Sequence, residues 1–271
     1  MKVVLPSMGI LGCKEVDLAI PVYANLRELS LVHYNEEEIG YEFVKMLLSD
    51  PKDLERMTFQ DKDYLLTIAV SALHLNNIKM NVKCSCGNPE SAVFVLGEQE
   101  VIDLEVGTPK MVEKECFGET YQYHFISASD ELKLVKWAKE QVPESATEED
   151  ADKIYKNKYL EAFTCRTFGF DVTDENLKKV QNYNLHVYMS ALLFREMSFH
   201  GIPGIVQTKC SKCGRNLNVI VPFSKSLMNW STQKVVDEFM QVANIVGGFK
   251  AFLDLTVSEL EQMRENQEAG L

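Results

Sequence analysis

The sequence predicts an α+β fold in which small β-hairpins are combined with longer helices. Two segments are predicted to form strands, and each leads into a closely spaced pair of cysteines that is followed by glycine; the first of these segments, 78–82, alternates apolar and polar residues. Apolar residues at helical spacing dominate the chain before, between and after these segments. The composition, 46% hydrophobic and 25% charged residues, is typical of a folded globular protein and not of a disordered or fibrous one.

The N-terminal region, residues 1–77, is predicted to form an arm followed by helices. Its first part is apolar but irregular, and glycine and proline interrupt it, so that only short strands are expected, at 3–5 and 18–23. This part is either an edge of the core or an arm that docks on a partner.

Two helices are predicted in the rest of this region. Asn35 is a typical N-cap residue, and the acidic residues 36–38 that follow it complement the helix dipole. Thr58 and Asp61 have the spacing of a capping box and are expected to start a second helix, over 60–75.

Two units of β-structure contain the cysteine pairs. Residues 78–107 form the first, with strands expected at 78–82, 92–96 and 101–106. Residues 203–223 form the second. Each unit is expected to place its cysteine pair between two strands.

Between the two units, residues 108–202 are predicted to form a mainly helical insert. One strand is expected at 121–126, followed by helices at 130–141, 148–164 and 173–199. The last of these is predicted to be the longest helix, because its apolar residues continue at helical spacing until a segment with glycine and proline stops them.

Residues 224–271 are predicted to form C-terminal helices, with a dense series of apolar residues between Met228 and Leu253. Either these helices complete the core of this chain, or part of their surface docks on a partner together with the N-terminal arm.

The two cysteine pairs are the residues of this sequence that indicate a metal-binding site. Two hairpins that each offer a pair of thiolates at their tips form a zinc ribbon, in which four sulfur atoms surround one Zn²⁺ tetrahedrally. Gly87 and Gly214 follow the pairs and allow the sharp turns that this arrangement needs. The predicted ligands of one structural zinc per chain are Cys84, Cys86, Cys210 and Cys213.

Basic residues flank both pairs in a chain that is otherwise acidic, and they would offset the negative charge of four thiolates on one Zn²⁺. These residues are Lys83, Lys209, Lys212 and Arg215. Because the pairs lie far apart in the sequence, the insert must split the ribbon. Two alternatives are open at this point: free thiols in two separate hairpins, or a zinc ion that bridges two chains.

The other reactive residue types do not form the pattern of a catalytic site. Cys13, Cys116 and Cys165 have apolar or aromatic neighbours and are predicted to be buried thiols. The sequence has no nucleophile elbow, Cys–His arrangement or glycine-rich phosphate loop. Because a closed four-sulfur site leaves no position for substrate, a scaffold and not an enzyme is predicted. Core or surface positions, and not metal ligation, are expected for His33, His74, His124, His186 and His200.

The net charge of -12 disfavours general binding to nucleic acid or to anionic membranes. No segment has the length and apolar character of a membrane-spanning helix, and the N-terminus lacks the pattern of a signal peptide. Seven cysteines, four of them in tight pairs, do not fit a secreted disulfide framework. Synthesis in a reducing cytoplasm is therefore expected.

With the split ribbon in view, the chain resembles the baseplate hub assembly proteins of T-even-like contractile-tail bacteriophages. Members of that family have N-terminal helices, a cysteine knuckle between strands, a long helical insert, a second knuckle and C-terminal helices. In this sequence that order falls on the two cysteine pairs, the insert 108–202 and the segment after Ser224, and covers most of residues 36–265. The first pair here is Cys-x-Cys, where the family pattern is Cys-x-x-Cys.

The resemblance implies a non-enzymatic, zinc-stabilised protein that helps to assemble the central hub of a phage tail baseplate or forms part of it. Its partners would be other baseplate or hub proteins. Its location would be the host cell cytoplasm during assembly, or the tail of the finished particle. The alternative is a zinc-ribbon protein associated with nucleic acid or transcription, for which the basic residues beside the cysteines are the support.

Overall fold

The computed structural model describes residues 1–30, 36–73, 77–116, 118–221 and 223–224. Within these residues it confirms the predicted α+β fold, because helices are combined with four two-stranded antiparallel sheets. The helices are α1 (Tyr23–Ser30), α2 (Glu36–Leu47), α3 (Asp53–Arg56), α4 (Phe59–Leu73), α5 (Ala128–Glu140), α6 (Glu148–Thr167), α7 (Asp174–Gln181) and α8 (Leu185–Met197), with a 3₁₀ turn, η1, at Leu96–Glu98. The strand pairs are β1 (Lys2–Val4) with β2 (Glu15–Asp17), β3 (Asn77–Lys83) with β4 (Pro89–Val95), β5 (Met111–Cys116) with β6 (Glu119–His124), and β7 (Ile205–Lys209) with β8 (Asn216–Ile220).

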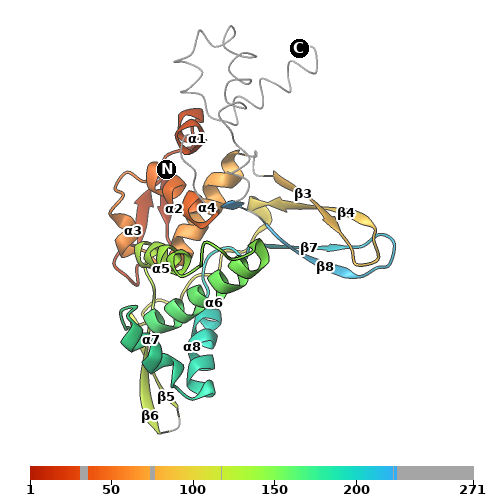
Figure 1. The fold of residues 1–271 in the computed structure, drawn as a ribbon. Helices are drawn as coiled ribbons and strands as arrows, with labels where there is room; N and C mark the ends of the chain where they lie inside the picture. Colours follow the sequence, from red (N-terminus) through yellow and green to blue (C-terminus); the bar gives the residue numbers. More distant parts are fainter. Residues whose placement is uncertain (31–35, 74–76, 117, 222, 225–271) are drawn as a thin grey trace, which may run out of the picture.

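The described chain has three parts (Figure 1). The body consists of β1, β2 and α1–α5. The arm consists of the hairpins β3–β4 and β7–β8, which lie side by side and project from the body. The lobe consists of the hairpin β5–β6 and of α6–α8, and it lies on another side of the body.

The main apolar core lies in the body and continues into the base of the arm. Phe43 of α2 and Leu65 of α4 are fully buried in it. Ile78, Phe94 and Val219 of the arm belong to the same cluster. Burial of these strand residues is favourable by roughly 2 kcal/mol for each large apolar side chain. The body therefore fixes the direction in which both hairpins leave it.

The lobe has an apolar cluster of its own, built around Tyr123 of β6 and Phe168, and a third, smaller cluster connects it to the body. In the connecting cluster, the rings of Phe59 from α4 and Phe163 from α6 meet edge to face with their centroids 5.6 Å apart. The lobe is therefore packed on the body and not merely tethered to it.

The segment that connects the two hairpins of the arm begins and ends at the same place in the structure. Ile102 and Gly201 form an antiparallel bridge in which each backbone N–H donates to the carbonyl of the other, at 2.9 and 2.8 Å. Residues that are far apart in sequence thus meet at the base of the arm. This closure lets a long insert separate the two hairpins without separating them in space.

The predicted capping box at the start of α4 is confirmed. The backbone N–H of Asp61 donates to the hydroxyl of Thr58 at 3.1 Å, and the Asp61 carboxylate accepts from the backbone N–H of Thr58 at 3.0 Å. The two side chains thus satisfy donors that the first turn of a helix would otherwise leave unpaired.

Two predictions of strands are wrong. Residues 101–106 do not form a strand; they follow η1 as a loop in which Ile102 makes a single bridge to Gly201 and Val106 lies exposed. Residues 18–23 do not form one either, because the strand ends at Asp17 and α1 begins at Tyr23.

The predicted helix over 173–199 is also wrong, because it is divided into α7 and α8. Asn182 ends the first helix, and the side chain of Asn184 caps the second by accepting from the backbone N–H of His186 at 3.0 Å. Asparagine competes with a helical backbone and favours such caps. The predictions for Asn35 and for residues 225–271 lie outside the described residues.

Candidate metal centre

Each hairpin of the arm turns back at its cysteine pair. In the first, the backbone N–H of Cys84 donates to the carbonyl of Asn88 at 2.9 Å, and that of Gly87 donates to the carbonyl of Cys84 at 2.8 Å. In the second, Cys210 donates to the carbonyl of Arg215 and receives a bond from Gly214, both at 2.9 Å. Two turns of similar construction therefore stand at the tips of adjacent hairpins.

The glycines in these turns have the backbone conformation for which they were predicted. The φ angle is +86° at Gly87 and +72° at Gly214, in the left-handed region that side chains with a Cβ rarely adopt. A Cβ at either position would meet nothing within 4 Å, so the requirement for glycine comes from the backbone and not from crowding.

The four predicted ligand residues meet at the tip of the arm. The sulfur of Cys84 lies 3.7 Å from that of Cys213, and the sulfur of Cys86 lies 3.6 Å from that of Cys210. All four sulfurs lie within 4.8 Å of one another. A sulfur–sulfur bond requires about 2 Å, so these are thiols and not disulfides.

The spacing of the sulfurs fits a single ion. Four ligands at about 2.3 Å from a tetrahedral zinc stand about 3.8 Å apart. The two shortest contacts bring together one sulfur from each hairpin, Cys84 with Cys213 and Cys86 with Cys210. The cluster therefore belongs to the two hairpins jointly, and within this one chain it can hold a metal.

Apolar side chains between the two hairpins hold the pairs in this position. Strands β4 and β7 are neighbours, although they share no ladder. Met80, Ala92 and Val219 are buried on the facing sides, while alternate residues such as Lys79 and Asn218 are exposed. This alternation of buried and exposed strand residues aims both tips at one point.

Polar contacts outside the cysteines lock the tips together. The carboxylate of Glu90 in β4 accepts from the backbone N–H of Ser211 at 2.6 Å and from its hydroxyl at 2.7 Å. Asn88 donates to the same hydroxyl at 3.1 Å. Across the other side, the guanidinium of Arg215 donates to the hydroxyl of Ser85. These contacts orient the two turns independently of the sulfurs.

The thiol of Cys84 is favoured in its ionised form. The backbone N–H of Cys86 points at its sulfur, and hydrogen bonds from Cys86, Cys210 and Cys213 add to this effect, so that the pKa of Cys84 falls to about 6. The pKa of Cys210 moves the other way, to about 12: the backbone N–H of Cys213 lowers it, but burial and the neighbouring thiols of Cys213 and Cys86 outweigh that effect. A metal binds the thiolate form, so its binding would have to displace the proton of Cys210.

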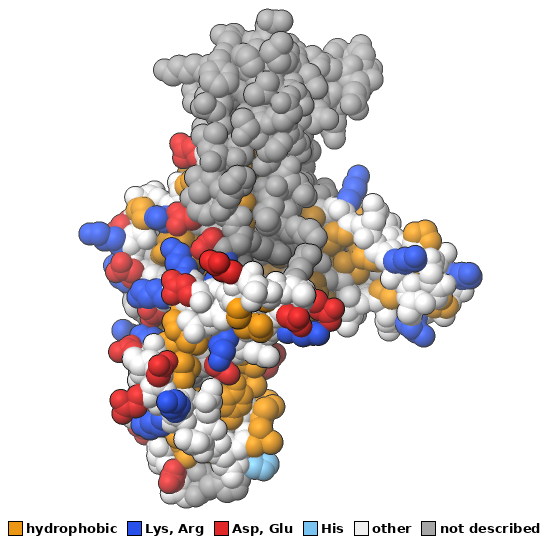
Figure 2. Space-filling model, viewed as in Figure 1, with side chains coloured by type: hydrophobic (Ala, Val, Ile, Leu, Met, Phe, Trp, Pro, Cys, Tyr) orange, Lys and Arg blue, Asp and Glu red, His pale blue; other side chains and the backbone are white. Residues whose placement is uncertain are grey.

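The arm is basic although the chain is acidic. Within its strands and turns, five basic residues stand against one acidic residue, Glu90, whose carboxylate is engaged by Ser211. Figure 2 shows Lys and Arg side chains spread over the projecting arm. The five residues, all exposed, are Lys79, Lys83, Lys209, Lys212 and Arg215.

The remaining cysteines are separate from this cluster. Cys13 and Cys165 are buried, as predicted, and burial raises the pKa of each thiol to about 11. The side chain of Cys116 lies outside the described part of the chain. These pKa values leave both buried thiols protonated and unreactive at neutral pH.

Among the histidines that the structure describes, none joins a metal-binding group. His124 packs against Gly169, and His186 lies exposed at the start of α8. His33 and His74 lie outside the described residues.

His200 takes part in a buried network that the sequence analysis missed. Its Nδ1–H donates to the carbonyl of Ser198 at 2.9 Å, and its Nε2 lies 2.6 Å from the hydroxyl of Thr58. Asp61, which caps α4, lies 3.8 Å from the ring and also accepts from the backbone N–H of Ser7 at 3.0 Å. Asp, His and Thr stand together here, but His200 and Asp61 have fully buried side chains, so the network ties α4 to the end of α8.

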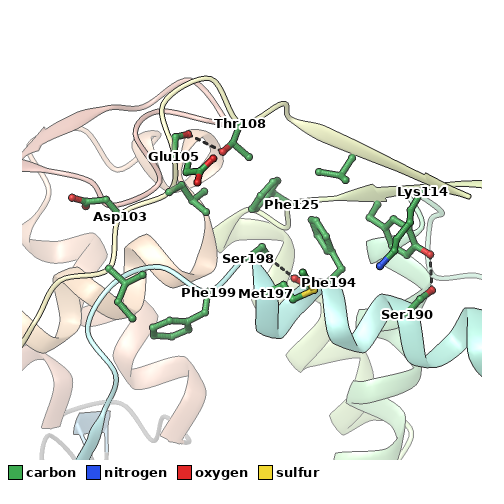
Figure 3. Close-up of a pocket in the computed structure, with 14 residues that line it drawn as sticks. Asp103, Glu105, Thr108, Lys114, Phe125, Ser190, Phe194, Met197, Ser198 and Phe199 are labelled. Carbon is green, nitrogen blue, oxygen red and sulfur yellow. Dashed lines mark hydrogen bonds between the residues drawn. The ribbon is translucent and has the colours of Figure 1, made fainter.

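A pocket of about 400 Å³ lies between the loop after η1 and the end of α8. Figure 3 shows Phe125, Phe194 and Phe199 around it. The hydroxyls at its wall are used within the chain: that of Ser190 lies 2.5 Å from the hydroxyl of Tyr123, and that of Ser198 donates to a backbone carbonyl at 2.6 Å. Asp103, Glu105 and Lys114 also line it, so that a few polar groups join a mainly apolar wall, as is common in ligand-binding pockets.

None of the helices in the described residues is long and apolar enough to cross a membrane. Comparisons with protein-family models, with curated proteins and with solved structures find no match to this chain. The proposals that follow therefore rest on the residues, their geometry and the resemblance in layout described above.

Proposed function

We propose that the four cysteines bind one Zn²⁺ per chain and that the arm is a split zinc ribbon. The observation that carries this proposal is the set of sulfur–sulfur distances, 3.6 and 3.7 Å, which suits a tetrahedral tetrathiolate site. The ligand set is all sulfur, which favours zinc over magnesium or calcium. Such a site leaves no position for water, so its role is structural.

The function that follows best is that of a non-enzymatic assembly factor or structural component of a phage tail baseplate hub. Three features support it: the split ribbon with its long insert, the resemblance of this layout to the hub assembly proteins of T-even-like phages, and apolar surface outside the core. The protein would act through contacts with other baseplate or hub proteins, in the cytoplasm of the host cell or in the assembled tail.

Metal content tests the first step. Native mass spectrometry of the full chain, purified under reducing conditions with zinc, is expected to show one zinc per chain. Cys213→Ser is expected to lose it, while Cys13→Ser, which changes a buried thiol outside the cluster, keeps it. A parent chain without zinc would refute the site, and half a zinc per chain would show that two chains share the ion.

Particle assembly tests the second step. The gene for this chain is disrupted in the genome that encodes it, and the products are viewed by electron microscopy. Capsids without tails, or tails that lack a complete baseplate, are expected, and the intact gene supplied in trans should restore them. Normal, infectious tails in the disrupted strain would refute the assembly role.

The basic arm favours a second candidate, a nucleic-acid-associated zinc ribbon. Because the arm projects from the body, its tip stands apart from the acidic surface, and charges beyond about 10 Å are largely screened at moderate salt. Double-stranded DNA or RNA added to the full chain would then bind with a strong salt dependence, and Lys212→Glu with Arg215→Glu would abolish binding. Absence of binding at low salt would remove this candidate.

A further inference from the structure

The pocket of about 400 Å³ beside α8 has a wall of aromatic rings. The rings of Tyr123 and Phe194 are stacked with their centroids 5.6 Å apart, and Phe125 meets Phe194 edge to face at 5.3 Å. Sites for small organic ligands measure about 300–1,000 Å³ and are mostly apolar, with a few polar groups that fix the orientation of the ligand. The size and the rings therefore suit a small ligand with an apolar middle part.

The loop on one side of the pocket is held in place by backbone hydrogen bonds. Ile102 is bridged to Gly201, and the N–H of Leu104 donates to the carbonyl of Pro6 at 2.8 Å. The N–H of Thr108 donates to the carbonyl of Glu105 at 3.1 Å and closes a turn there. This side of the pocket is thus formed before any ligand arrives, which lowers the cost of binding.

Strand β5 supplies the other side. Val112 and Lys114 line the pocket, while Glu113 and Glu115, which alternate with them along the strand, do not. Figure 3 shows Glu105 on one side of Phe125 and Lys114 on the other. The pocket therefore has an acidic side and a basic side, with aromatic rings between them.

These two charges are available to a ligand. Both side chains are exposed, and neither Glu105 nor Lys114 forms an ion pair with any residue in the described part of the chain. Asp103 also lines the pocket, but Figure 3 shows its side chain directed away from the rings. The hydroxyl groups in the lining already have hydrogen-bond partners within the chain; they belong to Thr108, Tyr123, Ser190 and Ser198.

From this arrangement we infer that the pocket binds a small zwitterion whose ammonium and carboxylate groups stand at opposite ends of an apolar body, the chemistry of an apolar dipeptide. The ammonium group donates to the carboxylate of Glu105, and the carboxylate of the ligand accepts from the amine of Lys114. The apolar body packs on Phe125 and Phe194. A free α-amino acid has both charges on one carbon atom and cannot reach both sides. This inference rests neither on the zinc site nor on the assembly role.

Isothermal titration calorimetry of the full chain tests the inference with the dipeptide leucyl-phenylalanine as the probe. Saturable binding of one dipeptide per chain is expected. The N-acetylated dipeptide lacks the ammonium group and the C-terminal amide lacks the carboxylate, so each should bind roughly 10-fold more weakly. Free phenylalanine should also bind more weakly than the dipeptide.

Substitutions on the two sides of the pocket assign the two ends of the ligand. Glu105→Gln should weaken binding of the dipeptide by roughly 10-fold and change little for its N-acetylated form. Lys114→Gln should do the same for the dipeptide and change little for the C-terminal amide. Glu115→Gln and Lys110→Gln are matched controls, because both residues are exposed and lie outside the lining of the pocket, and they should leave the affinity unchanged.

Three results would each overturn the inference: no saturable binding of the dipeptide, equal affinities for the dipeptide and its two capped forms, or variants at 105 and 114 that bind it as the parent does. Circular dichroism would check that the variants, all at exposed positions, keep the parent fold. The readout is direct binding of the probe, so its failure is distinct from a failure of the zinc site or of the assembly role.

Discussion

The carboxylate of Glu90 accepts two hydrogen bonds from Ser211, one from the backbone N–H at 2.6 Å and one from the hydroxyl at 2.7 Å. The two residues belong to different hairpins, and Ser211 lies between two of the predicted ligands. These bonds, first that of the Ser211 hydroxyl and then that of its N–H, also lower the pKa of Glu90. The contact thus holds the second cysteine pair against the first without using a sulfur atom.

Glu90→Gln is expected to weaken zinc binding by roughly 10-fold or more, because groups that orient metal ligands contribute on this scale. The amide keeps the shape of the side chain but loses the charge that favours both bonds. Competition for zinc with a coloured chelator measures the change. Glu98→Gln, in η1 and outside the arm, serves as the control, and equal affinities of the two variants would show that the contact does not support the site.

Gly214→Ala is expected to destabilise the folded chain by about 1–2 kcal/mol, the cost of placing a Cβ in the left-handed region. Space is not the cause, since a Cβ there meets nothing within 4 Å. Gly97→Ala provides a matched control, because Gly97 is equally open but has no left-handed φ. Urea unfolding of both variants compares the costs, and a neutral Gly214→Ala would mean that the turn tolerates another conformation.

Removal of the metal by a chelator is expected to loosen the arm first. The arm has few buried side chains beyond its base, while the body and the lobe have apolar clusters of their own. Hydrogen exchange should therefore accelerate in β3–β4 and β7–β8 and change little in α4 or α6. Uniform acceleration throughout the chain would show instead that the metal supports the whole fold.

Acid should destabilise the protein through His200. Burial lowers the pKa of this histidine below 6.5, although the carbonyl of Ser198 and the carboxylate of Asp61 oppose the effect. Below pH 6.5 the unfolded chain binds a proton that the folded chain does not, so the free energy of unfolding falls as the pH falls toward the folded pKa.

The check on His200 is the pH dependence of unfolding in the parent and in His200→Gln. The variant should lose part of the slope between pH 6.5 and the folded pKa. Burial lowers the pKa of His124 in the same direction, so some slope is expected in the variant as well. Identical slopes would show that His200 is not a source of the acid sensitivity.

Short sequence patterns predicted the features of this structure that are fixed by interactions between residues close together in the sequence. A predicted strand before each cysteine pair, with glycine after it, predicted both hairpins and all four members of the sulfur cluster. The capping box of Thr58 and Asp61 predicted the start of α4, because each of its bonds links residues three apart.

Features that depend on distant residues were not predictable in this way. Strand β5 has the sequence MVEKEC, which shows little apolar alternation, and it forms because β6 pairs with it. The contact of His200 with Thr58 joins residues separated by most of the insert, and no local pattern marks it. The division of the helix over 173–199 had a local signal, the asparagines at 182 and 184, which the continuing apolar residues outweighed.

The bridge between Ile102 and Gly201 has a consequence for how such a chain changes over generations. A segment that departs from and returns to a single pair of residues can grow, shrink or alter its outer surface while the geometry of the neighbouring hairpins is preserved. Selection for new contacts could therefore act on exposed side chains of the insert, such as Leu185 and Met197, while the sulfur cluster stays as it is.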